Sequence, residues 1–271
     1  MLECNETLME FSRLIREGGK NPYAGKLKTG VDLGTANIVL AVVDEENRPV
    51  AGATYGSTVV RDGIVVDYIG AVRAVTHMKR QLETLLETEL SVAAAAIPPG
   101  IIDGNVKVIS NVVEAAGFEV SNVIDEPTAA ATVIGLADGA VVDVGGGTTG
   151  ISILKGGRVV YSYDEPTGGT HMTLVLAGFH HVDAAVAEEW KKDASRESDV
   201  FSVIRPVVDK MASIVERSVA GYDVEKIYVV GGACSFQAFE EIFEKRLGIP
   251  TVKPAEPLLV TPLGIAMNCR T

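Results

Sequence analysis

The sequence predicts an α/β protein with two related halves, each built on a mixed β-sheet flanked by helices. A strand, a tight turn containing aspartate, glycine and threonine, and a second strand occur twice, at residues 30–43 and 141–154. Asp32 and Asp143 occupy the same place in the two copies. Helix and strand patterns then follow each copy in a similar order. Repetition on this scale indicates two domains of one fold.

Each copy of the repeat is extended by further helices and strands. In the first half we expect helices at residues 71–90, 103–116 and 126–136 and strands at residues 92–97 and 120–124. Gly117 is placed to end one of these helices, and Pro127 to begin another.

The second half follows the same scheme. We expect helices at residues 203–219, 236–247 and 257–269, strands at residues 226–230 and 251–252, and a polar loop at residues 193–199. Because the helix that ends the first half crosses toward the second, the closing helix should cross back. This predicts a domain I of residues 26–136 with 258–271, a domain II of residues 137–257, and a cleft between them.

Composition and charge restrict the partners. The 271 residues include 24 Lys and Arg and 36 Asp and Glu, a net charge of −12 at pH 7. Such a surface repels phosphate backbones, so nucleic acid is not an expected partner. No apolar run reaches the roughly 18 residues of a membrane span. With three scattered cysteines and no signal-peptide pattern, the chain is expected in the reducing cytoplasm.

The two aspartate-glycine-threonine turns have the composition of a phosphate clamp. Glycine lets backbone N–H groups approach an anion, threonine adds a hydroxyl donor, and the preceding carboxylate faces a possible divalent cation. One such turn alone is more often a plain hairpin turn, but two equivalent turns can close on one phosphate chain. The candidate phosphate-binding residues are Gly34, Thr35, Ala36, Asn37, Gly145, Gly146, Gly147, Thr148 and Thr149.

Two further motifs each allow a structural and a functional interpretation. Gly231, Gly232 and Ala233 follow an apolar strand, where a turn needing positive φ or a ligand contact is possible. Asp125 and Glu126 precede a helix, where they can cap it or, in the case of Glu126, polarise a water.

The order of these motifs resembles the actin/DnaK/hexokinase-like ATPase superfamily over residues 29 to about 268. The resemblance implies two ribonuclease H-like domains that bind ATP or ADP with Mg²⁺. It implies that Asp32 and Asp143 hold the metal through water and that Glu126 orients the attacking water; these three are the candidate catalytic residues. Segment 187–191 resembles the adenine-contacting helix of MreB. The nucleotide contacts added by the resemblance are Gly168, Gly169, Glu188, Lys191, Gly231, Gly232 and Ala233.

Taken whole, the chain is most similar to a chaperone-like branch of that superfamily that serves ethanolamine utilization and bacterial microcompartments. This similarity implies a protein client, either an ethanolamine-utilization enzyme or a microcompartment shell protein, and a cytoplasmic location associated with a microcompartment. Nucleotide-dependent domain closure would act on the client. The alternatives are a non-hydrolysing nucleotide-dependent scaffold, as in PilM relatives, and a small-molecule kinase.

The chain departs from the superfamily pattern in ways that predict weak ATP hydrolysis, if any. Gly150 stands where DnaK and MreB types carry an acid, and residues 261–266 lack the usual acid of the closing helix. The insert subdomains are reduced, both before residues 60–68 and between residues 169 and 203.

The first 25 residues lie outside this resemblance and predict an amphipathic helix and a linker. Leu8, Phe11, Leu14 and Ile15 form one apolar stripe, and residues 18–22 end the helix. Two interpretations are open. The stripe packs on the protein's own core, or it docks on a microcompartment shell protein as a helix in a groove.

Overall fold

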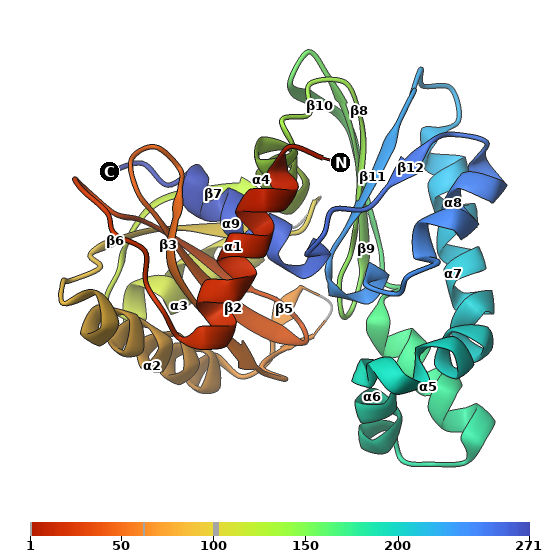
Figure 1. Ribbon diagram of the computed structural model, residues 1–271, viewed down its shortest axis with the longest axis horizontal. Helices are drawn as coiled ribbons and strands as arrows, with labels where there is room; N and C mark the ends of the chain where they lie inside the picture. Colours follow the sequence, from red (N-terminus) through yellow and green to blue (C-terminus); the bar gives the residue numbers. More distant parts are fainter. Residues whose placement is uncertain (1, 62, 100–102) are drawn as a thin grey trace.

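Two sheets with the same topology form the framework (Figure 1). The computed structural model describes residues 2–61, 63–99 and 103–271. Within these ranges the first sheet has the order β3-β2-β1-β6-β7 and the second the order β10-β9-β8-β11-β12. In each, an antiparallel meander is extended by two parallel strands. The predicted α/β fold with two mixed sheets is therefore confirmed.

The strands begin and end close to the predicted positions. The first sheet consists of β1 (Lys28–Leu33), β2 (Asn37–Val43), β3 (Pro49–Gly56), β6 (Val92–Ile97) and β7 (Glu119–Asp125). The second consists of β8 (Gly139–Val144), β9 (Thr149–Lys155), β10 (Arg158–Glu165), β11 (Ile227–Val230) and β12 (Thr251–Val252). A short hairpin, β4 (Val60–Arg61) with β5 (Ile64–Val65), follows the first meander.

Helices cover both faces of the sheets (Figure 1). Helices α2 (Tyr68–Leu86) and α3 (Asp103–Ala115) pack on the first sheet. Helices α5 (Gly169–His180), α6 (Ala184–Lys192), α7 (Glu197–Val219) and α8 (Phe239–Leu247) belong to the second half. Helices α4 (Glu126–Ile134) and α9 (Val260–Met267) lie between the two sheets.

Central strands are buried on both faces, as their continuous apolar runs require. In β2, Ile38 and Leu40 face the core under α2, whereas Val39 and Ala41 face the core around α4 and α9. Because side chains alternate across a strand, one apolar run serves two cores.

The closing helix α9 packs against β1, β2 and α4. The crossing is close because small residues meet there. Gly30 on β1 leaves room for the α9 backbone, since a Cβ at this position would lie 2.4 Å from the Ala266 nitrogen. Gly264 allows α9 to approach the Ala129 carbonyl of α4 in the same way.

The prediction of a polar loop at residues 193–199 is wrong. Residues Ala194–Arg196 form a 3₁₀ turn that Asp193 caps, and α7 begins at Glu197, not at residue 203. Glu197 and Asp199 are acids in the first turn, which favours a helix N-terminus. The polar composition reflects this exposed helix start rather than a loop.

The N-terminal helix α1 (Cys4–Glu17) packs on the protein's own core. Leu8 and Phe11 have no exposed surface and Leu14 only 1%, and Phe11 contacts β3 where Gly52 leaves space for its ring. The core-packing interpretation of the stripe is thus confirmed. Docking of the same stripe on a shell protein is wrong, because its side chains are already buried.

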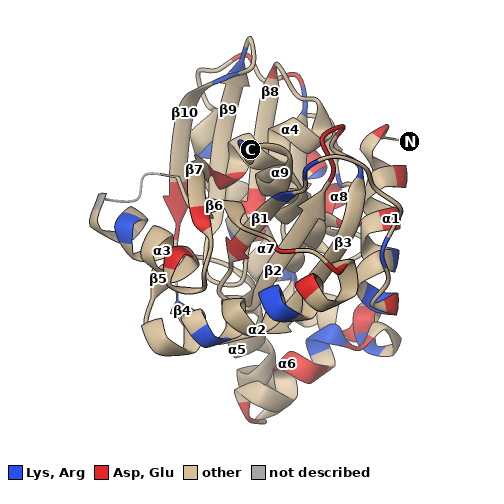
Figure 2. Cartoon of the chain, turned by 90° about the vertical axis from the view of Figure 1, so that its left-hand side faces the viewer, with Lys and Arg blue, Asp and Glu red and all other residues tan. Residues whose placement is uncertain are grey.

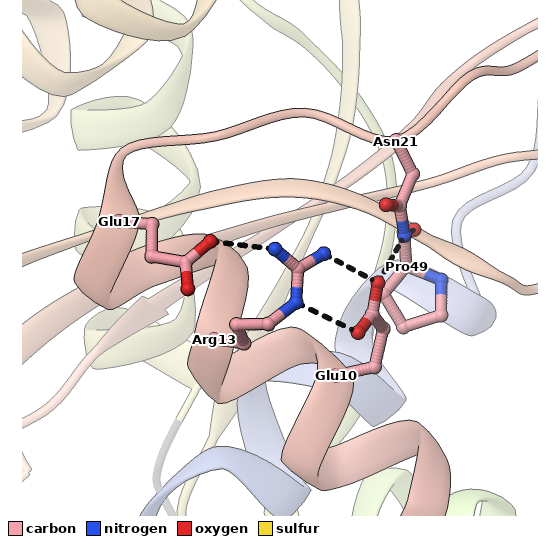
Figure 3. A network of polar contacts seen from close by, with 5 residues as sticks. All are labelled: Glu10, Arg13, Glu17, Asn21 and Pro49. Carbon is pink, nitrogen blue, oxygen red and sulfur yellow. Dashed lines mark hydrogen bonds and ion pairs between the residues drawn. The ribbon is translucent and has the colours of Figure 1, made fainter.

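Polar contacts also hold the segment that follows α1, which was expected to be a linker (Figure 3). The Asn21 side chain donates to Glu10 at 2.9 Å and to the Pro49 carbonyl at 3.0 Å. Arg13 donates to both oxygens of Glu10 and to Glu17. The Arg13 hydrogen bond, followed by that of Asn21, lowers the pKa of Glu10 to about 2.

Acidic and basic side chains are interleaved on the surface. In Figure 2, α1 and α6 each carry both acidic and basic residues. On α6, for example, Glu188 is followed by Lys191 and Lys192.

Candidate functional site

A cleft of about 600 Å³ lies between the two halves. This volume is within the range of small-molecule and cofactor sites, about 300–1,000 Å³. The predicted residues that line it are Asp32, Gly34, Thr35, Ala36, Asn37, Glu126, Asp143, Gly145, Gly146, Gly147, Thr148, Gly169, Glu188, Lys191, Gly231, Gly232 and Ala233. The structure therefore brings together residues from six separate segments of the chain.

The two glycine-containing turns face each other across this cleft. A Cβ added to Gly146 would lie 3.1 Å from the Ala36 Cβ, so the turns nearly touch. Each turn follows the carboxyl end of a central strand, β1 or β8, where ligands of α/β sheets bind. Backbone hydrogen bonds brace the second turn, from Gly169 N–H to the Gly145 carbonyl at 2.9 Å and from Thr170 N–H to the Gly146 carbonyl at 2.7 Å.

Two predicted ligand residues do not line the cleft. Thr149 is fully buried in β9 and its hydroxyl donates to the Thr167 carbonyl. Thr149 is the first residue of β9 and its side chain lies on a buried face of that strand, whereas Thr148 precedes the strand and lines the cleft. Gly168 packs under the second turn, where a Cβ would lie 2.7 Å from the Gly145 carbonyl oxygen.

Three carboxylates enter the cleft from different elements. Asp32 and Asp143 are the next-to-last residues of β1 and β8, and Glu126 begins α4. The helix cap is supplied by Asp125, whose Oδ1 accepts from Thr128 N–H at 2.9 Å. Glu126 is therefore not required for capping and faces the cleft.

Burial raises the pKa of each of these three acids, and repulsion by neighbouring carboxylates adds to it for Asp32 and Glu126. For Asp32, burial and then the charge of Asp143 raise the pKa to about 7. For Glu126, burial is again the largest cause, followed by Asp143 and Asp32, and its pKa lies well above the usual range. Burial raises the pKa of Asp143, and a hydrogen bond from Thr261 partly opposes this. Negative charge is thus costly here unless a cation compensates it.

These donors fit a hard divalent cation. Carboxylate oxygens are the ligands of Mg²⁺, which keeps several waters and binds through one or two carboxylates plus substrate phosphates. Over the described part of the chain, no group of three His, Cys, Asp or Glu side chains is arranged to hold a metal directly. Binding of the metal through water, by Asp32 and Asp143 on opposite sides of the cleft, is compatible with this arrangement.

Lys191 lines the cleft but is already hydrogen-bonded. Its ammonium lies 2.6 Å from Glu188 Oε2, 2.7 Å from the Thr173 hydroxyl and 2.9 Å from the Gly169 carbonyl. Burial lowers the pKa of Lys191. For Glu188, burial raises the pKa, but hydrogen bonds from Lys191 and Thr173 outweigh it. The cluster fixes α6 against the start of α5, beside the second turn.

The Gly231–Gly232 turn is compatible with both interpretations, a turn that needs positive φ and a contact with a ligand. Gly231 has φ +90°, so the turn does need positive φ, and both glycines line the cleft. The cleft residues that the sequence did not single out include Pro98, Glu197, Phe236, Leu258 and Thr261. They come from helix starts and loops with no common motif, and only the fold brings them together.

Two similar halves, facing glycine turns and a pair of crossing helices between the sheets define an actin/DnaK-like protein. The family described as Hsp70 protein matches residues 67–211. The ethanolamine utilization protein EutJ of Escherichia coli (strain K12) is 43% identical over 242 residues, which cover 89% of this chain and 85% of the relative. The chain belongs to the EutJ family.

Solved structures agree with this assignment. The crystal structure of EutJ from Carboxydothermus hydrogenoformans has 48% sequence identity and a TM-score of 0.94, covering 98% of both chains. MreB5 of Spiroplasma citri bound to AMPPNP is 17% identical with a TM-score of 0.73, covering 89% of this chain and 95% of that one. The second likeness concerns the fold alone.

None of the helices in the described residues is long and apolar enough to cross a bilayer.

Proposed function

We propose that this protein binds ATP or ADP with Mg²⁺ in the cleft and that closure of its halves around the nucleotide acts on a protein client. The observation that carries the proposal is that both glycine turns, one from each half, line the same cleft of about 600 Å³. Phosphates between these turns would be held from both sides by backbone N–H groups. The closing units are domain I, residues 26–136 with 258–271, and domain II, residues 137–257.

The residues of the cleft divide into those that would bind the phosphates and those that would bind the hydrated metal ion. Backbone N–H groups of the two turns, with the hydroxyls of Thr35 and Thr148, would bind the phosphate oxygens. Asp32 and Asp143 would hold waters of the metal. When bound, Mg²⁺ supplies positive charge that offsets both the phosphates and the crowded carboxylates.

Hydrolysis would depend on Glu126. Glu126 is the first residue of α4 and lines the cleft, where its carboxyl group would orient a water toward the terminal phosphate. Burial and the neighbouring acids Asp143 and Asp32 raise its pKa, and a cation in the site would oppose this by favouring the charged carboxylate. Catalysis would come from positioning and charge stabilisation, which dominate phosphoryl transfer.

The client is proposed from the relatives. The relatives at 43% and 48% sequence identity are ethanolamine utilization proteins. We therefore place the client among ethanolamine-utilization enzymes or microcompartment shell proteins, which gives the protein a chaperone-like role in the cytoplasm at a microcompartment.

A non-hydrolysing scaffold is the second candidate, and two observations favour it. Gly150 offers no carboxylate at the start of β9, and the Lys191 ammonium already has three partners in the second half of the protein. In such a scaffold, nucleotide would only stabilise the closed shape.

Two measurements test these proposals. Mg-ATP at 100 times its Kd should stabilise the protein by about 2.7 kcal/mol, which corresponds to a rise in Tm of about 5–10 °C. Phosphate release should then be compared between wild type, Glu126→Ala and the exposed control Glu89→Ala. Phosphate release by wild type and Glu89→Ala, but not by Glu126→Ala, would support an ATPase. Nucleotide binding without phosphate release would support the scaffold. Absence of any nucleotide-induced stabilisation would contradict both.

A further inference from the structure

Thr261 links the helix between the sheets to the candidate metal site. It lies in the first turn of α9, is 5% exposed and lines the cleft. Its hydroxyl donates to Asp143 Oδ2 at 2.7 Å, although the two residues are 118 positions apart. Because α9 packs against β1 and Asp143 is the next-to-last residue of β8, this hydrogen bond joins the two halves of the protein.

The backbone around Thr261 is held firmly. A Cβ on Gly30 of β1 would lie 2.9 Å from the Pro262 carbonyl oxygen, so α9 rests directly on the β1 backbone. Thr261 is followed by Pro262, whose ring fixes φ in the first helical turn. The hydroxyl therefore occupies a defined place relative to the first sheet.

Asp143 is confined on its other side as well. A Cβ at Gly231 would lie 2.4 Å from Asp143 Oδ1, so this oxygen sits directly against the glycine backbone. One carboxylate oxygen is thus packed against Gly231 and the other accepts from Thr261. Both contacts together define the orientation of the carboxylate.

Asp32, the counterpart of Asp143 in the repeat, is held differently. Asp32 occupies the same position in the first half, yet among the described residues no side chain hydrogen-bonds to its carboxylate, and only burial and the charge of Asp143 act on it. Of the two aspartates, Asp143 is the one that the protein orients before a ligand arrives. An oriented carboxylate loses less conformational freedom when it binds a ligand.

We infer that Thr261 is a positioning residue that orients Asp143 toward the metal-bound waters and so sets the affinity for magnesium-bound nucleotide. The inference rests on the proposed function, because it assumes nucleotide in the cleft. Thr261 acts through Asp143, and its hydroxyl proton remains on Thr261 throughout.

Calorimetry with ADP on the full chain, with Mg²⁺ and separately with EDTA, tests this role. Thr261→Val keeps the shape of the side chain but removes the donor, and Thr261→Ser keeps the donor. We expect Thr261→Val to raise the Kd of ADP about tenfold in Mg²⁺, in line with the loss of a hydrogen bond to a charged group. With EDTA its Kd should stay within about twofold of wild type, and Thr261→Ser should resemble wild type in both conditions.

Each other outcome has a distinct meaning. Equal weakening by Thr261→Val with and without Mg²⁺ would show a merely structural role and overturn the inference, as would unchanged binding in Mg²⁺. If Thr261→Val does not fold, Thr261→Ala replaces it with the same expectation. Absence of ADP binding by wild type would instead refute the proposed function itself.

Discussion

Gly264 is the position where a single methyl group should disturb the framework most. It lies on α9 where this helix crosses α4 between the two sheets. A Cβ there would lie 1.9 Å from the Ala129 carbonyl oxygen and 2.5 Å from its carbonyl carbon. Both neighbours are backbone atoms of a buried helix, so no side chain can rotate away.

The magnitude of the Gly264→Ala effect follows from two opposing contributions. Replacing glycine by alanine inside a helix stabilises by about 1 kcal/mol. Overpacking a close contact costs typically about 1–3 kcal/mol and more where backbone must move, and here α4 and α9 must separate by more than an ångström. Because backbone has to move here, we take the cost to be about 3–5 kcal/mol, so the free energy of unfolding should fall by about 2–4 kcal/mol and Tm by roughly 5–10 °C.

Urea and thermal unfolding of the purified variant measure this change. Gly178→Ala is the matched control, because Gly178 also lies within a helix, α5, but nothing is found within 4 Å of its Cβ position. The control should be more stable than wild type by about 0.5–1 kcal/mol. Equal stability of the two variants would refute the reasoning about the helix crossing.

Two further predictions concern pH and the N-terminal helix. The pKa of Asp32 is raised from 3.8 to about 7 in the folded state. Protonation of Asp32 therefore favours the folded state, and this contribution to stability is complete below pH 4 and is lost as the pH rises to 7. Metal-free Asp32→Asn should therefore be more stable than wild type at pH 8, with a gap in Tm that closes toward pH 4; a gap that does not vary with pH would contradict this. Phe11→Ala should cost about 3–5 kcal/mol because Phe11 is fully buried. Met9→Ala, at 55% exposure, should be nearly neutral, and similar urea midpoints for the two variants would refute the account of α1.

The sequence predicted the framework well where local patterns determine it. β6 was expected at residues 92–97 and β12 at residues 251–252, and both are found there. The start of α7 was missed because its first turn is exposed and polar, which by composition looks like a loop. The acids Glu197 and Asp199 in that turn are the local signal that could have placed the helix N-terminus there.

The candidate site was predictable in part for a related reason. The glycine turns carry a local signature, and both line the cleft. Thr149 was misplaced because a motif gives residue types but not the face of the strand on which each side chain lies. Thr261 could not be identified, because its partner Asp143 is 118 residues away and no local pattern marks the pair.

Binding of Mg-ADP to wild type and to Asp143→Ala, measured by calorimetry, tests the central claim most directly. Asp223→Ala, an exposed aspartate in the loop before β11, controls for the loss of one charge. The nucleotide-cleft account predicts one site in wild type and in the control, and at least about tenfold weaker binding by a folded Asp143→Ala. Unchanged affinity in Asp143→Ala, or no binding by wild type, would contradict it.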